Sequence, residues 1–307
     1  MAENEGPRVP ADPPDLPPPT GATGATAESP RRGGRRWLII GAVAVVFVLL
    51  IGYVVGGAAV AGGRVGKADN ALKTTVSHNN TIAGIFDKDP FKDVKFEGDN
   101  PDLGGAKAAV ATFKQQVSTW QADVSGDRTA LERVRPELSS SLLTLPEQAT
   151  IDNRRHRVDA GLSALSTAQK AIDIDNKRVA FLEAFMDALA GFVALGNATD
   201  LAGVQGQLPA TGSNLQKAAQ LAQPPAIPPE VTPIVKAMQQ AVADLQAMVK
   251  AVQANDEAGF NRANAALEAD VKTLSNFDAD AVDKADKARF QPLIDAYNRD
   301  MKIAAGS

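Results

Sequence analysis

The sequence predicts an all-α fold: a single N-terminal transmembrane helix, followed by an elongated antiparallel helical bundle that contains a long heptad hairpin. Residues 37–55 form an apolar run without a charged side chain. Beyond it, apolar residues recur every seven positions over two long segments, which is typical of helices that pack along a narrow seam. Period-two alternation extends over only a few residues, so no sheet is expected.

We expect residues 37–61 to cross a membrane once. As a helix, residues 37–55 would cover about 28 Å, close to the ~30 Å hydrocarbon core of a bilayer. Trp37 and Tyr53 lie near the two ends, where aromatic rings favour the interface. Arginines precede the run at positions 31, 32, 35 and 36. The positive-inside rule therefore places the N-terminus in the cytoplasm and the remainder of the chain outside.

A cleaved signal peptide is the alternative for this segment, with a cleavage site near Ala59. The apolar stretch, however, exceeds the ~7–15 residues of a typical signal, and residues 1–36 are a long leader for one. An anchor that stays in the mature chain fits both observations better.

Changes in composition divide the chain into five segments. Residues 1–36 are a Pro-rich tail that is predicted to be disordered, because its isolated apolar residues cannot offset the entropy of ordering. The transmembrane helix of residues 37–61 follows. Residues 62–101 are predicted to form a juxtamembrane helix and an acidic loop. Residues 102–197 are the long helical hairpin, and residues 198–307 are a C-terminal helical subdomain.

Two heptad series define the predicted hairpin. The first comprises Val110, Val117, Val124, Leu131, Leu138 and Leu145, and the second comprises Ile151, Val158, Leu165, Ile172, Val179, Met186 and Val193. Asn100 is expected to cap the first helix, and Pro136 predicts a kink near residue 135 or a division into two helices. Residues 144–147 are predicted to form a tight turn before one helix of about 70 Å over residues 147–195.

Shorter helices are expected in the C-terminal subdomain. Asp200 can cap a helix that ends before Pro209, and a second short helix is predicted over residues 215–221. Residues 223–229 contain four prolines and predict a stiff, extended linker. Apolar periodicity predicts further helices on the C-terminal side of this linker.

The residue types that most enzymes use for catalysis are scarce. The chain has no cysteine, which excludes disulfides, thiolate metal sites and cysteine nucleophiles. Its two histidines, His78 and His156, have no second ligand at metal-binding spacing and are expected to be solvated. The acidic loop over residues 87–102 lacks the EF-hand order of calcium ligands. We therefore expect no catalytic residue, no cofactor, no metal and no enzymatic activity.

A basic cluster is the first candidate for partner binding. Arg154, Arg155 and Arg157 lie close together within the second heptad helix. One interpretation is an ion pair between Arg155 and Glu137 across the hairpin, which would set the register and contribute at most about 1 kcal/mol if exposed. The other interpretation is an exposed patch that binds an anionic polymer or a protein.

Two aromatic rings are the second candidate. Only 5% of the residues are aromatic, yet Phe113 and Trp120 lie on one helix that is otherwise lined by Val and Ala. Such rings commonly belong to a hydrophobic core. Alternatively, they line a groove for an apolar ligand or a partner helix.

The leading functional hypothesis is a non-enzymatic envelope scaffold in the cell membrane. Long heptad helices suit other helices, so we expect a protein partner or a second copy of the chain to bind them near the membrane. The alternative is a ligand-binding ectodomain that works with a separate signalling or transport partner. The net charge of -4, with both signs intermixed, argues against nucleic acid as a partner.

Overall fold

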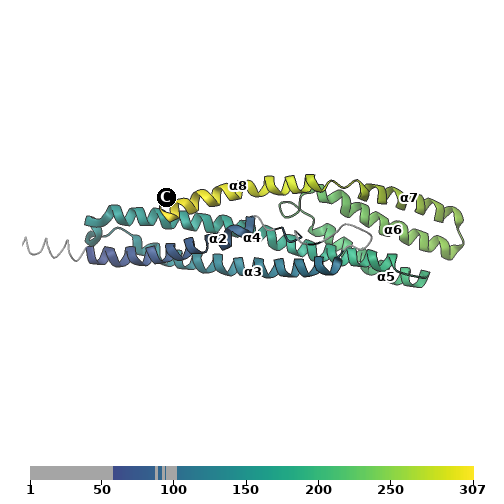
Figure 1. Ribbon diagram of the computed structural model, residues 1–307, viewed down its shortest axis with the longest axis horizontal. Coiled ribbons are helices and arrows are strands. Elements are labelled where there is room, and N and C mark those ends of the chain that lie inside the picture. Colours follow the sequence, from purple (N-terminus) through teal and green to yellow (C-terminus); the bar gives the residue numbers. More distant parts are fainter. Residues whose placement is uncertain (1–57, 87–88, 92–93, 95–101) are drawn as a thin grey trace, which may run out of the picture. The chain divides into compact units, whose positions relative to one another are not determined.

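The structure, a computed structural model, describes residues 58–86, 89–91, 94 and 102–307. Each secondary-structure element in these residues is a helix (Figure 1), so the all-α prediction is confirmed for the described part of the chain. The predicted tail of residues 1–36 and nearly all of the predicted transmembrane helix of residues 37–61 lie outside the described residues.

The longest helix is the one around which the others pack. α4 spans Gln148–Gly196 and directly follows η3, a 3-10 helix over Leu142–Glu147. These bounds confirm the prediction of one long helix over residues 147–195. The helices that pack against α4 are α3 (Leu103–Val134), α5 (Leu201–Leu221) and α8 (Ala279–Ala305).

By length and composition alone, the stretch Leu142–Gly196 is apolar enough to cross a membrane, and no other helix in the described part of the chain meets that test. Its apolar side chains nevertheless have protein neighbours on several sides, because Ala188 and Leu195 are buried against α5 and Ile172 is buried against the rest of the bundle. We attribute its apolar composition to this packing, since a helix that is surrounded by others is apolar over most of its circumference.

Helices α3 and α4 run antiparallel. Three ion pairs join this hairpin: Lys107–Asp187 at 2.8 Å, Lys114–Glu183 at 2.8 Å and Arg135–Asp159 at 2.6 Å. The position of the acidic partner on α4 falls as the position of the basic partner rises, as an antiparallel pair requires. Because all six side chains are at least 40% exposed, each pair contributes only about 0–1 kcal/mol and mainly marks the register.

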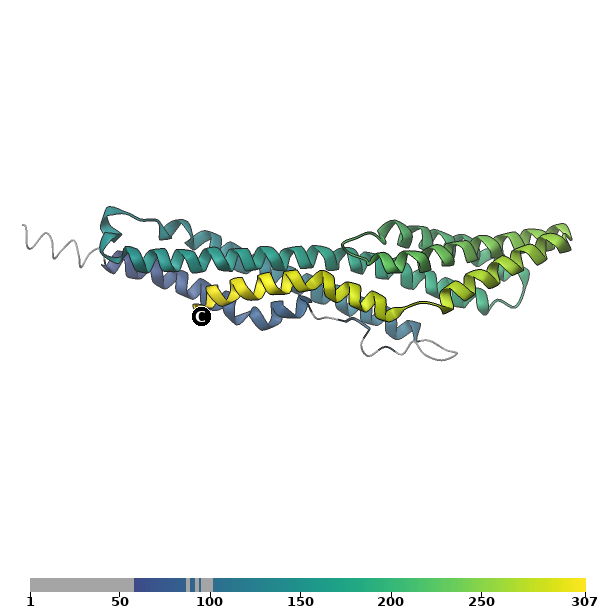
Figure 2. The same ribbon diagram turned by 90° about the horizontal axis from the view of Figure 1, so that it is seen from above.

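A first core joins the start of the described chain to α3, the N-terminal half of α4, and α8. The helix over residues 58–77 is followed by α2 (Asn79–Ala83) and by η1, a 3-10 helix over Gly84–Phe86. Apolar side chains of these segments and of α8 belong to the same buried cluster. The C-terminal helix therefore returns to cover residues near the beginning of the described chain (Figure 2).

A second core lies between the C-terminal half of α4, α5 and α6 (Thr232–Ala254). Ala188 of α4, Leu215 of α5 and Met238 of α6 are among its buried residues. α7 (Glu257–Ser275) packs against α6 and has no comparable contact with another described element. α7 is thus covered mainly on the side that faces α6.

The connection between α3 and α4 differs from the predicted tight turn. α3 ends at Val134, and the 3-10 helices η2 (Pro136–Leu138) and η3 follow, because Pro136 cannot donate the backbone hydrogen bond that would continue α3. Leu145 is 50% exposed within this connection, so it does not extend the heptad seam. Val193 of the second series is also exposed. Near this residue α4 packs against α5 instead of α3, so a different face of α4 is buried there.

The prolines of the C-terminal subdomain act differently from the prediction. Pro209 lies inside the single helix α5, because it is on an exposed face where water can bind the carbonyl that loses its partner. Residues 223–229 are not an extended linker. The backbone carbonyl of Gln223 accepts hydrogen bonds from the amides of Ala226 and Ile227 at 3.1 Å, and both residues are buried.

Aspartate side chains cap four helices at their N-termini. The cap of α3 is Asp102 rather than the predicted Asn100, and its carboxylate accepts a hydrogen bond from the amide of Gly105 at 2.7 Å. Asp200 caps α5 as predicted. Asp256 and Asp278 cap α7 and α8. These carboxylates accept hydrogen bonds from amides of the first turn that have no other partner. Their negative charge is also stabilised by the positive end of the helix dipole.

Gly191 lies at a close approach of α4 and α5, and this supports a stability prediction. A methyl group at Gly191 would lie 2.3 Å from Oγ1 and 3.0 Å from Cβ of the buried Thr211, whereas one at Gly126 of α3 would meet nothing within 4 Å. Gly191→Ala should therefore lower the free energy of unfolding by about 1–3 kcal/mol through overpacking. Gly126→Ala should raise it by up to about 1 kcal/mol through helix propensity. Chemical denaturation followed by circular dichroism measures both, and equal effects would contradict the close approach.

Candidate functional site

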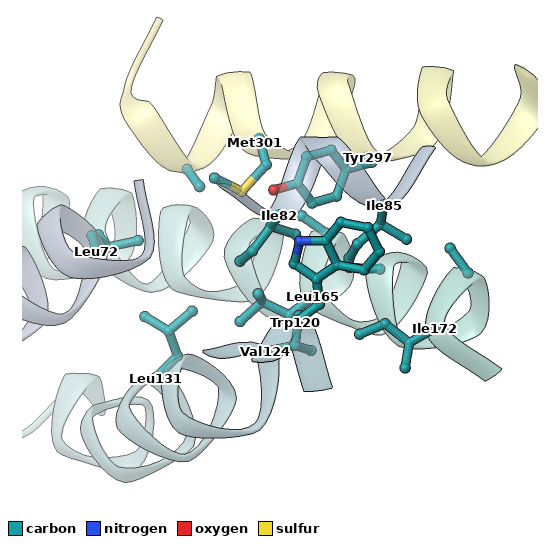
Figure 3. Close-up of a cluster of buried hydrophobic side chains, with 14 of the residues drawn as sticks. Leu72, Ile82, Ile85, Trp120, Val124, Leu131, Leu165, Ile172, Tyr297 and Met301 are labelled. Atoms are coloured by element: carbon teal, nitrogen blue, oxygen red, sulfur yellow. The ribbon is translucent and has the colours of Figure 1, made fainter. Parts of the chain in front are cut away.

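The two aromatic rings predicted as a partner site are part of the first core. Phe113 and Trp120 are 1% and 2% exposed, and their rings meet edge to face with centroids 6.3 Å apart. Trp120 lies among Ile82, Leu165 and Tyr297 (Figure 3). Of the two interpretations, the core interpretation describes their position, and neither ring offers surface to a partner in this structure.

The basic cluster is dispersed over three different environments. Nε of Arg154 lies 2.6 Å from a carboxylate oxygen of Asp69, and Nε of Arg157 donates to the carbonyl of Ala304 at 3.0 Å. Of the three, Arg155 alone has neither an ion pair nor a side-chain hydrogen bond among the described residues. Two of the three arginines therefore hold neighbouring helices against α4.

The predicted ion pair between Arg155 and Glu137 is wrong. Glu137 instead accepts from Nζ of Lys67 at 2.9 Å. The prediction assumed a tight turn near residue 146, with both residues at equal distance from it. Because two 3-10 helices replace that turn, Glu137 faces the helix over residues 58–77 rather than α4.

Arg155 lines a polar groove of about 920 Å³ between the ends of α3 and α4. Two ion pairs, Arg128–Glu132 and Arg135–Asp159, neutralise most of the charge along this groove. The groove is open to solvent and holds no buried polar group that lacks a partner. It therefore lacks the concentrated positive charge that an anionic polymer would require.

A second pocket, of about 420 Å³, combines apolar walls with a charged network. Residues from η1, the following turn, α4, the segment around η4 (Pro229–Val231) and α8 line it. Its walls include Phe86, Phe181 and Phe290, and Lys287 and Asp283 lie at the α8 side. Apolar walls with a few charged groups are typical of sites for small amphipathic molecules.

The charged network beside this pocket is centred on Asp286 of α8. Arg178 and Arg289 both donate to its carboxylate, and both guanidinium groups stack on the ring of Phe290, at 5.5 and 5.1 Å from the centroid. Asp175 lies 3.9 Å from Arg178 and is 1% exposed, and neither of its carboxylate oxygens has a hydrogen-bond partner among the described residues. Burial raises the pKa of Asp175 to about 7, although Arg178 and Arg289 oppose the shift.

The residues of this pocket could not be assembled from the sequence. They come from four segments that are far apart along the chain, and no fixed spacing relates them. Arg178 and Asp175 are one helical turn apart on α4, which is a common spacing for surface ion pairs as well. The sequence therefore offers one indication of this pocket, namely charged residues within a helix that is otherwise buried.

A separate buried polar group, the carboxylate of Asp127, pairs with His78, which the sequence predicted to be solvated. Nδ1 of His78 lies 3.0 Å from a carboxylate oxygen of Asp127, which is 4% exposed on its side chain. Burial raises the pKa of Asp127, while the hydrogen bond from His78 opposes the rise. The hydroxyl of Tyr297 is buried without a hydrogen-bond partner among the described residues, and burial and the charge of Asp127 both raise its pKa.

Apolar side chains near the C-terminal end of α7 and just beyond it are only partly covered. Leu267, Val271 and Leu274 of α7, and Phe277 in the connection to α8, follow one another at steps of four, three and three residues, and we refer to them as the α7 stripe. Leu274 also packs against the second core. Val271 and Phe277 are 52% and 44% exposed, and Leu267 and Leu274 are half-buried. Ala263 is the one residue of α7 that is buried.

Comparisons with known proteins add no relative. The chain matches no protein-family model, no curated protein and no solved structure. Within the described residues, no three histidine, aspartate or glutamate side chains are placed to share a metal ion.

The buried Asp175 predicts a pH dependence of stability. Because its folded-state pKa of about 7 lies above the ordinary pKa of 3.8 for an aspartate, the folded chain holds a proton between these pH values that the unfolded chain has lost. The free energy of unfolding should therefore fall by up to about 4 kcal/mol as the pH rises from about 4 to about 7. Asp175→Asn should remove this slope and unfold at higher denaturant concentration than the wild type at pH 8. Parallel pH profiles for the two proteins would contradict the assignment.

Proposed function

We propose that this protein is a membrane-anchored, extracytoplasmic scaffold without enzymatic activity, and that its α7 stripe binds a helical segment of a partner protein. The observation that supports this is that, among the described elements, α7 packs mainly against α6, and that Val271 and Phe277 are exposed. A helix of a partner that packs against α6 and α7 would give α7 neighbours on a second side, as α4 has within the bundle.

The anchor follows from the apolar run over residues 37–55. Its length matches a single crossing, and the arginines before it favour a cytoplasmic N-terminus. The described helices would then lie outside the cytoplasm and remain attached to the membrane. An anchor of this kind concentrates a binding surface near membrane partners, which suits a scaffold.

The spacing of the α7 stripe favours a helix as the occupant. Side chains at steps of three and four residues lie along one side of a helix, and the apolar face of a second helix is complementary to such a row. Covering one exposed Val or Phe side chain fully is worth about 1.5–3 kcal/mol. Charged side chains such as Glu268 and Lys272 flank the row and can form the polar rim of an interface.

Photo-crosslinking tests this interface. A photoreactive residue at Val271, in the full-length protein in its native membrane, should give a discrete protein adduct, while the same residue at Thr273 should not. Both positions are exposed, but Thr273 lies outside the stripe. Mass spectrometry identifies the adduct. Equal labelling at the two positions would contradict a specific interface, and an adduct of two copies of the chain would replace the partner protein by a homo-oligomer.

A charge within the stripe should disrupt the same interface. Burying an unpaired carboxylate is unfavourable by several kcal/mol, so Val271→Asp should lower the yield of an adduct formed from position 277 at least about tenfold. Thr273→Asp is the matched control and should leave the yield unchanged. Circular dichroism should show equal helicity in both variants, because neither position is buried.

The pocket beside Arg178 supports a second candidate function, a ligand-binding ectodomain. Its aromatic walls and adjacent charges suit a small amphipathic molecule. An environment-sensitive anionic dye such as anilinonaphthalene sulfonate should bind there. Val282→Trp, which fills the pocket, should raise the dissociation constant at least about tenfold, while Val271→Trp should not. A dissociation constant that is unchanged by Val282→Trp would exclude this pocket as the dye site.

A further inference from the structure

We propose that the connection between α3 and α4 inserts its exposed leucines into the surface of the lipid bilayer that holds residues 37–55, since Ala61 of the predicted span is buried in the first core. This inference rests on the membrane anchor of the proposed function and concerns a surface that the proposed partner interface does not use. We refer to residues 139–147 as the leucine loop.

The leucine loop concentrates exposed apolar surface. Leu142, Leu143 and Leu145 are 78%, 53% and 50% exposed, and Leu142 is the most exposed of the large apolar side chains in the described part of the chain. Between Leu138 and Ile151, the sequence contains one charged residue, Glu147. A loop at a water-exposed surface ordinarily carries polar residues, so this composition indicates a less polar environment.

The loop presents these side chains in a folded conformation. Leu138, directly before the loop, and Thr144, within it, are buried and hold the loop against the bundle. The hydroxyl of Thr144 accepts a hydrogen bond from the amide of Ser141 at 2.9 Å, and the amide of Thr144 donates to the carbonyl of Ser141 at 2.9 Å. The leucines therefore point outward from an ordered 3-10 helix, and their exposure is a property of the fold.

Polar contacts hold the leucine loop beside the start of the described chain. A guanidinium nitrogen of Arg64 donates to the carbonyl of Ser139 at 3.2 Å, and Nζ of Lys67 lies 2.9 Å from Glu137. Figures 1 and 2 both show the connection between α3 and α4 at the end of the bundle where the helix over residues 58–77 begins. The loop and residue 58 thus occupy the same end.

The covalent connection limits the distance between this end of the bundle and the bilayer. Residue 58 follows Val55, the last residue of the apolar run, by three positions, and three residues span at most about 11 Å even when fully extended. The end of the membrane-crossing segment is therefore within about 11 Å of residue 58, whatever path the intervening residues take. Apolar side chains of membrane-bound segments reach about 5–10 Å into the boundary between headgroups and acyl chains. A bilayer surface is consequently the apolar phase nearest to the three leucines.

The loop and the anchor together would be two attachment points for one bundle. A single span leaves a rigid bundle free to tilt about its exit point, whereas a second contact beside it restricts that tilt. The α7 stripe belongs to the opposite end of the bundle (Figure 1). The leucine loop would thus limit the range of positions at which the stripe meets a partner.

Site-specific labelling tests this proposal, and the chain suits it because it has no cysteine. Leu143→Cys, Val271→Cys and Val46→Cys would each carry a nitrobenzoxadiazole fluorophore in full-length protein in vesicles of phosphatidylcholine and phosphatidylglycerol. Leu143 and Val271 are a matched pair, since they are 53% and 52% exposed. Nitroxide-labelled lipid should quench the label at position 143 at least about threefold more than the label at position 271.

The label at position 46 separates this proposal from the membrane anchor. Quenching at position 46 with equal, weak quenching at positions 143 and 271 would overturn the loop proposal and leave the anchor intact. Quenching at neither position 46 nor position 143 would overturn both. A blue-shifted spectrum at position 143 without lipid quenching would mean that protein covers the leucines, and it would also overturn the proposal.

A second variant removes the apolar surface without touching the buried residues of the loop. With the label at Ser140→Cys, the triple change Leu142→Ser, Leu143→Ser and Leu145→Ser should abolish lipid quenching and leave the helicity unchanged. Val271→Ser with the same label should retain the quenching. Retained quenching in the triple variant would show that the leucines do not hold the loop in the bilayer.

Discussion

The packing of α4 against helices on several sides is the constraint on which the rest of the structure depends. Two glycines allow it. A methyl group at Gly161 would lie 2.9 Å from Leu131 of α3 and 3.7 Å from Ala304 of α8, and one at Gly191 would overlap Thr211 of α5. Larger side chains at these positions would separate α4 from its neighbours, and both cores would lose the close contacts that their aliphatic side chains need.

The group of buried charges on α4 lies where the first core ends along this helix. Val179 is the last residue of α4 in the first core, and Phe181 belongs to a cluster formed with α5, α6 and the turn after α5. Arg178 directly precedes Val179 and pairs with Asp286 of α8. Removing one partner of such a pair leaves an uncompensated charge, so the network penalises any register of α8 on α4 other than the observed one.

The uncovered apolar surfaces lie at the two ends of the bundle. At one end the leucine loop adjoins the start of the described chain, and at the other α7 packs mainly against α6. Between them, the rings of Phe113 and Trp120 are sealed within the first core. The pocket beside Arg178 is separate from both surfaces and combines aromatic walls with charged side chains.

Local sequence determined much of this protein. The three- and seven-residue spacing of apolar side chains specified helices, Asp200 and Asp256 specified helix starts, and Pro136 specified the end of α3, because each acts through neighbouring residues. Tertiary structure alone decided the partners. Pro209 is tolerated within α5 because its turn of the helix faces water. Glu137 pairs with Lys67 because the connection between α3 and α4 is longer than a tight turn. The residues that line the pocket come from four segments that are far apart along the chain. Those outcomes depend on which helices pack against each other, and this is decided by contacts between residues far apart in the sequence.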